Sequence, residues 1–165
     1  MLWVMRKPKW IASERTERIG RFHLDGKAGD IYPLLCPVRE YEWLPGWSCT
    51  MAYAVSGAAE KDAVFHTVEA FGKKAVWTLI TFQPDLLVEY LIVSGRNAVV
   101  RLSISLAENT KSGTDVTWRM LFTTTSFLGK EMVGHAFSEE RFHRMMERRE
   151  AELGHFLKTG TMIGE

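Results

Sequence analysis

The stretch that decides the fold is residues 114–158, TDVTWRMLFTTTSFLGKEMVGHAFSEERFHRMMERREAELGHFLK. Its first part, residues 114–125, alternates apolar side chains such as Val116, Trp118 and Met120 with polar ones, as a half-buried strand does. From about residue 130 to 158 the apolar residues recur at helical spacing instead. Because no proline follows Pro84, we expect one uninterrupted amphipathic helix there, about 42 Å long.

The same two-residue alternation recurs in earlier segments that end at turn residues. We predict strands at residues 16–25, 47–56, 63–70, 74–82, 86–94, 98–107 and 114–125. The last six follow one another through short turns and therefore form an antiparallel meander. Two short helices at residues 28–35 and 36–45, limited by Pro33, Pro37 and Pro45, separate the first strand from this meander.

This order of elements predicts an α+β fold in which a long C-terminal helix packs on a curved, seven-stranded antiparallel sheet. Such a sheet twists and curls, and a single helix fills its concave face only partly. The short helices close one end. We therefore expect an internal space between helix and sheet, lined by apolar and aromatic side chains.

The composition fits one globular domain. The chain has 165 residues, of which 46% are hydrophobic and 25% charged, and this balance excludes wholesale disorder. A net charge of +1, with basic residues dispersed among acidic ones, argues against nucleic acid as a partner. The apolar runs are far shorter than a membrane span, so we expect no membrane insertion.

The N-terminal residues predict a cytoplasmic protein. Met1 to Met5 are largely apolar and precede basic residues, which reverses the order of a secretory signal. We expect residues 1–15 to form an extension that packs on the domain through Trp3 and Trp10, residues 16–160 a single domain, and residues 161–165 a tail. The two cysteines, Cys36 and Cys49, are expected to be separate buried thiols, with one bridge as the alternative.

Four sequence motifs carry a family resemblance. They are residues 32–47, YPLLCPVREYEWLPGW; the pair Val76-Trp77; residues 123–126, TTTS, with Gly129; and residues 155–160, HFLKTG. With the element order, they resemble a bacterial branch of the START and birch-pollen-allergen-like superfamily, also called SRPBCC, over residues 16–160. The resemblance implies the helix-grip fold and a hydrophobic cavity for a small ligand. It implies no particular reaction, because this fold serves lipid carriers, hormone receptors, polyketide aromatase/cyclases and co-chaperone domains.

Three residues are candidates for acid–base chemistry. Glu40 lies among aromatic residues, where its pKa would be raised; the alternative is that it caps a backbone turn or pairs with Arg39 or another arginine. Tyr90 shares a strand face with Val88 and should point inward, so that its hydroxyl could meet a ligand carbonyl. His66 is a weaker candidate, because a single histidine on an apolar face is more often structural.

Several large side chains are candidates for ligand contact. The four indoles of the domain could form a stacking wall for a flat ligand, or they could be ordinary core residues. Two methionines on inward faces complete the set. These residues are Trp43, Trp47, Trp77, Trp118, Met120 and Met146.

Arg149 falls on the apolar stripe of the C-terminal helix, between Met146 and Leu153. An inward arginine needs a carboxylate, supplied by Glu40 or by a ligand. The alternative is that its aliphatic part lies on apolar surface while its charged group reaches water. We expect Glu152 on the opposite, wet face of the helix, paired with Arg148 four residues earlier.

His135, Glu139 and His143 are spaced four apart, but the outer two lie about 12 Å apart along a helix, too far for one metal ion. We expect a solvated polar face there, although the spacing leaves a two-residue site open. Phosphate-binding loops, HExxH and CxxC motifs and a nucleophile elbow are missing from the sequence. We therefore expect neither a metal nor a cofactor.

Two functions of different classes follow. The first is a carrier or sensor that binds a small hydrophobic or aromatic molecule. The alternative is an enzyme of the cyclase, aromatase or dehydratase type that uses Glu40, helped by Tyr90 or His66. A weaker alternative is a co-chaperone-like interaction domain. The chain could be a monomer or a homodimer formed through an exposed sheet edge.

Overall fold

One antiparallel sheet of seven strands forms the body of the protein, in the order β1-β7-β6-β5-β4-β3-β2. The structure, a computed structural model, describes residues 13–68, 74–109 and 113–164. The strands are β1 (Glu14–Leu24), β2 (Cys49–Tyr53), β3 (Val64–Val68), β4 (Lys74–Gln83), β5 (Leu87–Ser94), β6 (Ala98–Asn109) and β7 (Gly113–Thr124). The helices are α1 (Ala28–Ile31), the 3-10 turns η1 (Tyr32–Leu35) and η2 (Glu40–Glu42), α2 (Phe127–Ala136) and α3 (Glu139–Thr159).

The predicted α+β architecture, a seven-stranded antiparallel sheet that contains a six-stranded meander, is confirmed, and the structure adds that β1 pairs with β7. β1 begins at Glu14, two residues earlier than predicted, and the strand expected at residues 47–56 is reduced to β2. The first predicted helix is a turn of α1 followed by η1, and Pro33 lies near the start of η1. Trp3 and Trp10 lie outside the described residues. Within those residues, no helix is both long and apolar enough to span a membrane.

The expectation of one uninterrupted C-terminal helix is wrong. The helix breaks at Phe137, whose backbone leaves the helical region, and α3 restarts after Ser138, whose hydroxyl accepts a hydrogen bond from the amide of Arg141. The carbonyl of Phe137 accepts a hydrogen bond from Arg18 Nε at 2.9 Å. A serine cap followed by Glu139 is a standard helix start, and it overrides the continuous apolar spacing.

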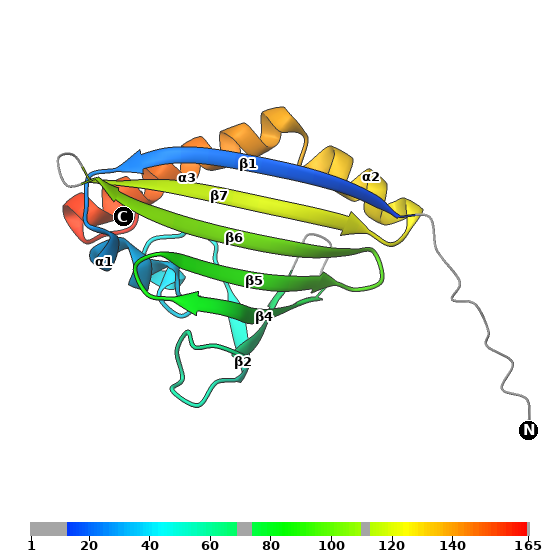
Figure 1. Ribbon diagram of the computed structural model, residues 1–165, viewed down its shortest axis with the longest axis horizontal. Coiled ribbons are helices and arrows are strands. Elements are labelled where there is room, and N and C mark those ends of the chain that lie inside the picture. The colour runs from blue at the N-terminus through cyan, green and yellow to red at the C-terminus, as the bar shows by residue number, and fades with distance from the viewer. Residues whose placement is uncertain (1–12, 69–73, 110–112, 165) are drawn as a thin grey trace, which may run out of the picture.

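Both helices lie along one side of the sheet (Figure 1): α3 packs on β1 and α2 packs on β7. Close approach at Gly20 fixes this position, because a methyl group there would lie 2.2 Å from Cγ of Met146. The helices α2 and α3 therefore lie over the β1–β7 side of the concave face, whereas α1 contacts β6 and η1 contacts β5.

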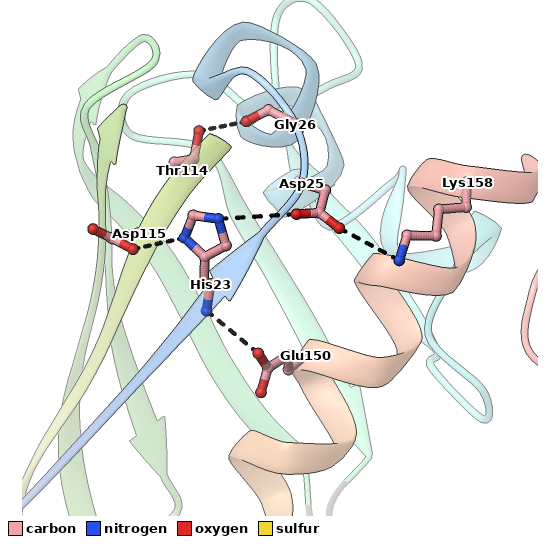
Figure 2. Close-up of polar contacts among 7 residues, drawn as sticks. All are labelled: His23, Asp25, Gly26, Thr114, Asp115, Glu150 and Lys158. Carbon is pink, nitrogen blue, oxygen red and sulfur yellow. Dashed lines mark hydrogen bonds and ion pairs between the residues drawn. The ribbon is translucent and has the colours of Figure 1, made fainter. Parts of the chain in front are cut away.

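Polar contacts hold the C-terminal part of α3 against the end of β1 (Figure 2). Lys158 lies 3.4 Å from Asp25, and Glu150 accepts a hydrogen bond from the amide of His23 at 3.4 Å. The ring of His23 lies 2.8 Å from Asp115 on β7. These contacts are solvent-exposed, so they orient the helix end more than they stabilise it.

Two glycines of α2 provide a matched test of how this helix is seated. A methyl group on Gly129 would lie 2.0 Å from the backbone oxygen of Asn97, whereas one on Gly134 would meet no atom within 4 Å. We expect Gly129→Ala to lower the free energy of unfolding by about 1–3 kcal/mol. Gly134→Ala should raise it by up to about 1 kcal/mol, because alanine favours the helix. Urea titration followed by far-ultraviolet circular dichroism measures both, and an unchanged Gly129→Ala protein would contradict the close contact.

Candidate functional site

A cavity of about 390 Å³ lies between the concave face and the helices. Its floor is formed by inward residues of β3 to β7, and its other walls come from α2, α3 and the segment around η2. The lining residues are Pro37, Glu40, Leu44, Trp47, Phe65, Trp77, Tyr90, Ile92, Ser94, Asn97, Ala98, Val100, Leu102, Trp118, Met120, Phe122, Gly129, Met132, Val133, Ala136, Phe137, Met145 and Arg149. The internal space predicted from the sequence is therefore present, and it is mainly apolar.

Four aromatic rings form one wall of this cavity. Phe65 stacks on Trp77 with ring centroids 5.4 Å apart, and both meet Tyr90 edge-on at 5.9 and 5.8 Å. Trp47, in the loop before β2, meets Trp77 edge-on with ring centroids 6.0 Å apart. Because Phe65 lies directly opposite Trp77 in the β3–β4 register, the sheet itself sets this arrangement.

Hydrogen bonds inside the protein fix the polar atoms of these rings. Trp47 Nε1 donates to the carbonyl of Pro37 at 2.8 Å, and Trp77 Nε1 donates to the hydroxyl of Thr67 at 2.8 Å. The Tyr90 hydroxyl donates to the carbonyl of Leu35 at 3.0 Å. A protein carbonyl therefore accepts the Tyr90 hydrogen bond that we expected a ligand carbonyl to accept. The rings present mainly their apolar surfaces to the cavity.

Trp118 differs from the other indoles. It is 7% exposed and lines the cavity, and its Nε1 is buried with no hydrogen-bond partner among the described residues. Buried N–H groups in proteins are almost always paired, and each unpaired one costs free energy.

Glu40 lies on the short η2 turn and is 9% exposed. Burial raises its pKa from 4.5 to about 8, while the positive charge of Arg149 acts in the opposite direction. The pairing with Arg39 considered above does not form, because Arg39 binds Glu42 instead, at 2.7 Å. Around neutral pH, Glu40 is therefore a largely protonated carboxyl group at the cavity wall.

Arg149 points inward from α3 and binds Glu152, with 2.5 Å between Nη1 and Oε2. The side chain of Arg149 is 20% exposed and that of Glu152 is 5% exposed. The predicted Arg148–Glu152 pair on the wet face is therefore wrong. Glu152 follows Arg149 by three residues and lies on the same inward stripe, so the nearer arginine takes it.

The structure brings seven of the ten predicted site residues to the cavity: Glu40, Trp47, Trp77, Tyr90, Trp118, Met120 and Arg149. The other three lie elsewhere. Trp43 is fully buried and donates to the carbonyl of Leu34, and Met146 packs over Gly20. His66 lies on the opposite strand face from Phe65, outside the lining, so it is not positioned to help Glu40. Phe65 was not predicted, because we had placed the adjacent residue His66 on the inner face of this strand.

Within the described residues, no group of three or more His, Cys, Asp or Glu side chains is arranged to hold a metal ion. Cys36 and Cys49 are free, as predicted. Cys36 is buried, and its sulfur accepts a hydrogen bond from the amide of Ala59 at 3.1 Å. Cys49 is half-buried rather than buried, and burial raises the pKa of its thiol.

Solved structures resemble this one in fold. Norcoclaurine synthase from Thalictrum flavum matches with a TM-score of 0.65 and 12% identity, over 92% of this chain and 98% of that one. The Mll3558 protein from Rhizobium loti matches at 0.61 and 10%, over 86% and 99%. DynU16, from the dynemicin biosynthetic locus, matches at 0.58 and 10%, over 88% of this chain and 48% of its own.

This protein has the helix-grip fold that these solved structures share. No protein-family model matches its sequence, and a search of curated proteins returns no match. At these identities the likeness establishes the helix-grip fold alone, so the function of this chain has to be argued from its own cavity.

The pH dependence of stability tests the state of Glu40. Between pH 4.5 and about 8 the folded chain keeps a proton on Glu40 that the unfolded chain has lost. The free energy of unfolding should therefore fall as pH rises through this interval, by at most about 1.4 kcal/mol per pH unit. Glu40→Gln removes this contribution, so the two proteins should differ in slope when urea titrations are repeated across the interval.

Glu42→Gln is the matched control on the same turn. Glu42 is exposed and its pKa is lowered by Arg39, so its replacement should affect the slope only at lower pH. Equal slopes for wild type and Glu40→Gln between pH 5 and 8 would mean that Glu40 is solvated and ionised.

Proposed function

We propose that this helix-grip protein binds a small hydrophobic or aromatic molecule in the cavity, as a carrier or sensor. The observation that carries the proposal is the 390 Å³ space behind the ring wall of Trp47, Phe65, Trp77 and Tyr90. Its volume falls within the range of about 300–1,000 Å³ that is usual for small-molecule sites. Its lining combines a large apolar area with a few polar groups, as such sites do.

The chemistry of the lining supports a flat ligand. Aromatic rings bind other rings by stacking or by edge contacts, and the wall offers both faces and edges. Its polar atoms are already hydrogen-bonded within the protein, so a ring that covers it leaves none of them newly unpaired. An apolar ligand therefore gains contact area there without a desolvation penalty.

Calorimetric titration with N-phenylnaphthylamine, a neutral aromatic probe, tests the proposal. We expect saturable binding with a negative heat-capacity change, the mark of apolar burial. Val100→Phe should weaken binding at least about tenfold by filling the cavity, since one lost ring contact is worth roughly this factor. Val99→Phe, on the outer face of the same strand, should bind like wild type. Loss of binding in both variants, or in neither, would contradict the proposed site.

Native mass spectrometry of the purified protein addresses the natural ligand. A co-purified compound, released by gentle denaturation, would identify the chemical class. The Val100→Phe protein should then be isolated with less of that compound than the Val99→Phe protein.

A second candidate function is enzymatic, and Glu40 favours it. A carboxyl group with a pKa of about 8 at the wall of an apolar cavity can exchange a proton with a bound molecule near neutral pH. Tyr90 is not available as a proton donor, because its hydroxyl donates to the carbonyl of Leu35. His66 lies on the strand face that points away from the cavity. Glu40 alone would therefore carry the acid–base step of a cyclase- or dehydratase-type reaction.

Deuterium exchange on acetylnaphthalene with a deuterated methyl group tests this step. Ionised Glu40 would remove a deuteron from the methyl carbon, the electron pair would move to the carbonyl oxygen, and a proton from solvent would replace the deuteron. We expect exchange, followed by mass spectrometry, to rise with pH up to about 8 and then level off. Glu40→Gln should exchange at the solvent rate while Glu42→Gln matches wild type, and equal rates for all three would exclude Glu40 as the base.

A further inference from the structure

The cavity wall carries hydrogen-bond donors that have no acceptor within the described part of the protein. The indole N–H of Trp118 is buried without an acceptor among the described residues. Arg149 uses one terminal nitrogen for Glu152, and its guanidinium carries five N–H donors in all. The carbonyl of Pro37 in the lining and that of Leu35 beside Tyr90 already accept hydrogen bonds from protein donors. The wall therefore offers N–H groups, on Trp118 and Arg149, to which a ligand acceptor could bind.

The positive charge of Arg149 is balanced by the negative charge of Glu152. Arg149 and Glu152 are 2.5 Å apart, and their side chains are 20% and 5% exposed, so the pair is partly shielded from water. Glu40, the carboxyl group of the lining, stays largely protonated near neutral pH because of its burial. A protonated carboxyl group is itself a donor.

Resting on the proposed function, we propose that the ligand carries a neutral hydrogen-bond acceptor, a carbonyl oxygen, which Arg149 and Glu40 receive, and that Glu152 makes the site reject anions. Glu152 does so by positioning the guanidinium and by balancing its charge. A ligand carboxylate would lose its hydration and meet a guanidinium that is already neutralised. A ligand ammonium group would meet N–H donors where it needs an acceptor.

Three isosteric probes separate these chemistries: acetylnaphthalene, isopropenylnaphthalene and naphthoate, substituted at the same ring position. They share shape and ring system but carry a ketone, a hydrocarbon group and a carboxylate. We expect wild type to bind the ketone at least about tenfold more tightly than the hydrocarbon, since a hydrogen bond to a charged group is worth about that factor. Naphthoate should bind more weakly than the ketone.

Two variants test the residues by calorimetry. Glu152→Gln leaves the charge of Arg149 unbalanced, so naphthoate should bind at least about tenfold more tightly than to wild type. The double variant Arg149→Met with Glu152→Leu replaces the pair by apolar groups, a change that proteins often tolerate. It should bind the ketone less tightly than wild type does, so that the preference for ketone over hydrocarbon becomes smaller, because Glu40 is then the remaining donor of the two. Arg148→Met, on the exposed face of α3, is the control and should keep the wild-type preferences.

The outcomes separate this inference from the proposed function. Equal affinity of wild type for ketone and hydrocarbon would overturn the inference and leave the apolar site intact. An unchanged naphthoate affinity in Glu152→Gln would overturn the role of Glu152, and this conservative variant remains informative if the double variant does not fold. Failure of all three probes and of N-phenylnaphthylamine to bind would overturn the proposed function itself.

Discussion

The missing side chain of Gly20 determines where the C-terminal helix lies, and the cavity depends on that position. Met146 occupies the space that any larger residue on β1 would fill, so α3 packs directly on the first strand. Gly129 does the same for α2, which rests on the backbone of Asn97. With both helices held at one side, they cannot also pack on β4 and β5, and the aromatic residues of those strands are left to line a space rather than a closed core.

The ion pair between Arg149, which lines this space, and Glu152 is a costly arrangement. Arg149 and Glu152 gain little net stability from each other, because each loses its hydration on burial. A pair of apolar residues would fill the same volume at lower cost. Under the proposed function, the reason for the ion pair lies in the ligand that the cavity would bind rather than in the stability of the fold.

Much of the fold was predictable, because strand alternation is a strong signal when one face of a sheet is buried. Trp118 and Met120 on β7 were assigned to the inner face correctly for that reason. The break at Ser138 was not predicted, because the capping serine lies within an unbroken series of apolar spacings. In the site, Tyr90 could be found from its apolar neighbours, whereas Phe65 was lost to a one-residue choice of face. The Arg149–Glu152 pair depends on helix phase, which sequence spacing fixes only to within a residue.

The closure of the sheet has a consequence for the order in which the chain folds. The strands from β2 to β7 pair with neighbours close in sequence, but β1 bonds to β7 across 110 residues. A nascent chain therefore assembles the meander from local contacts first, while β1 waits for its partner. Because α3 packs on β1, the wall of the cavity that α3 supplies forms only after both ends of the domain have come together. The complete cavity is therefore expected to form late in folding.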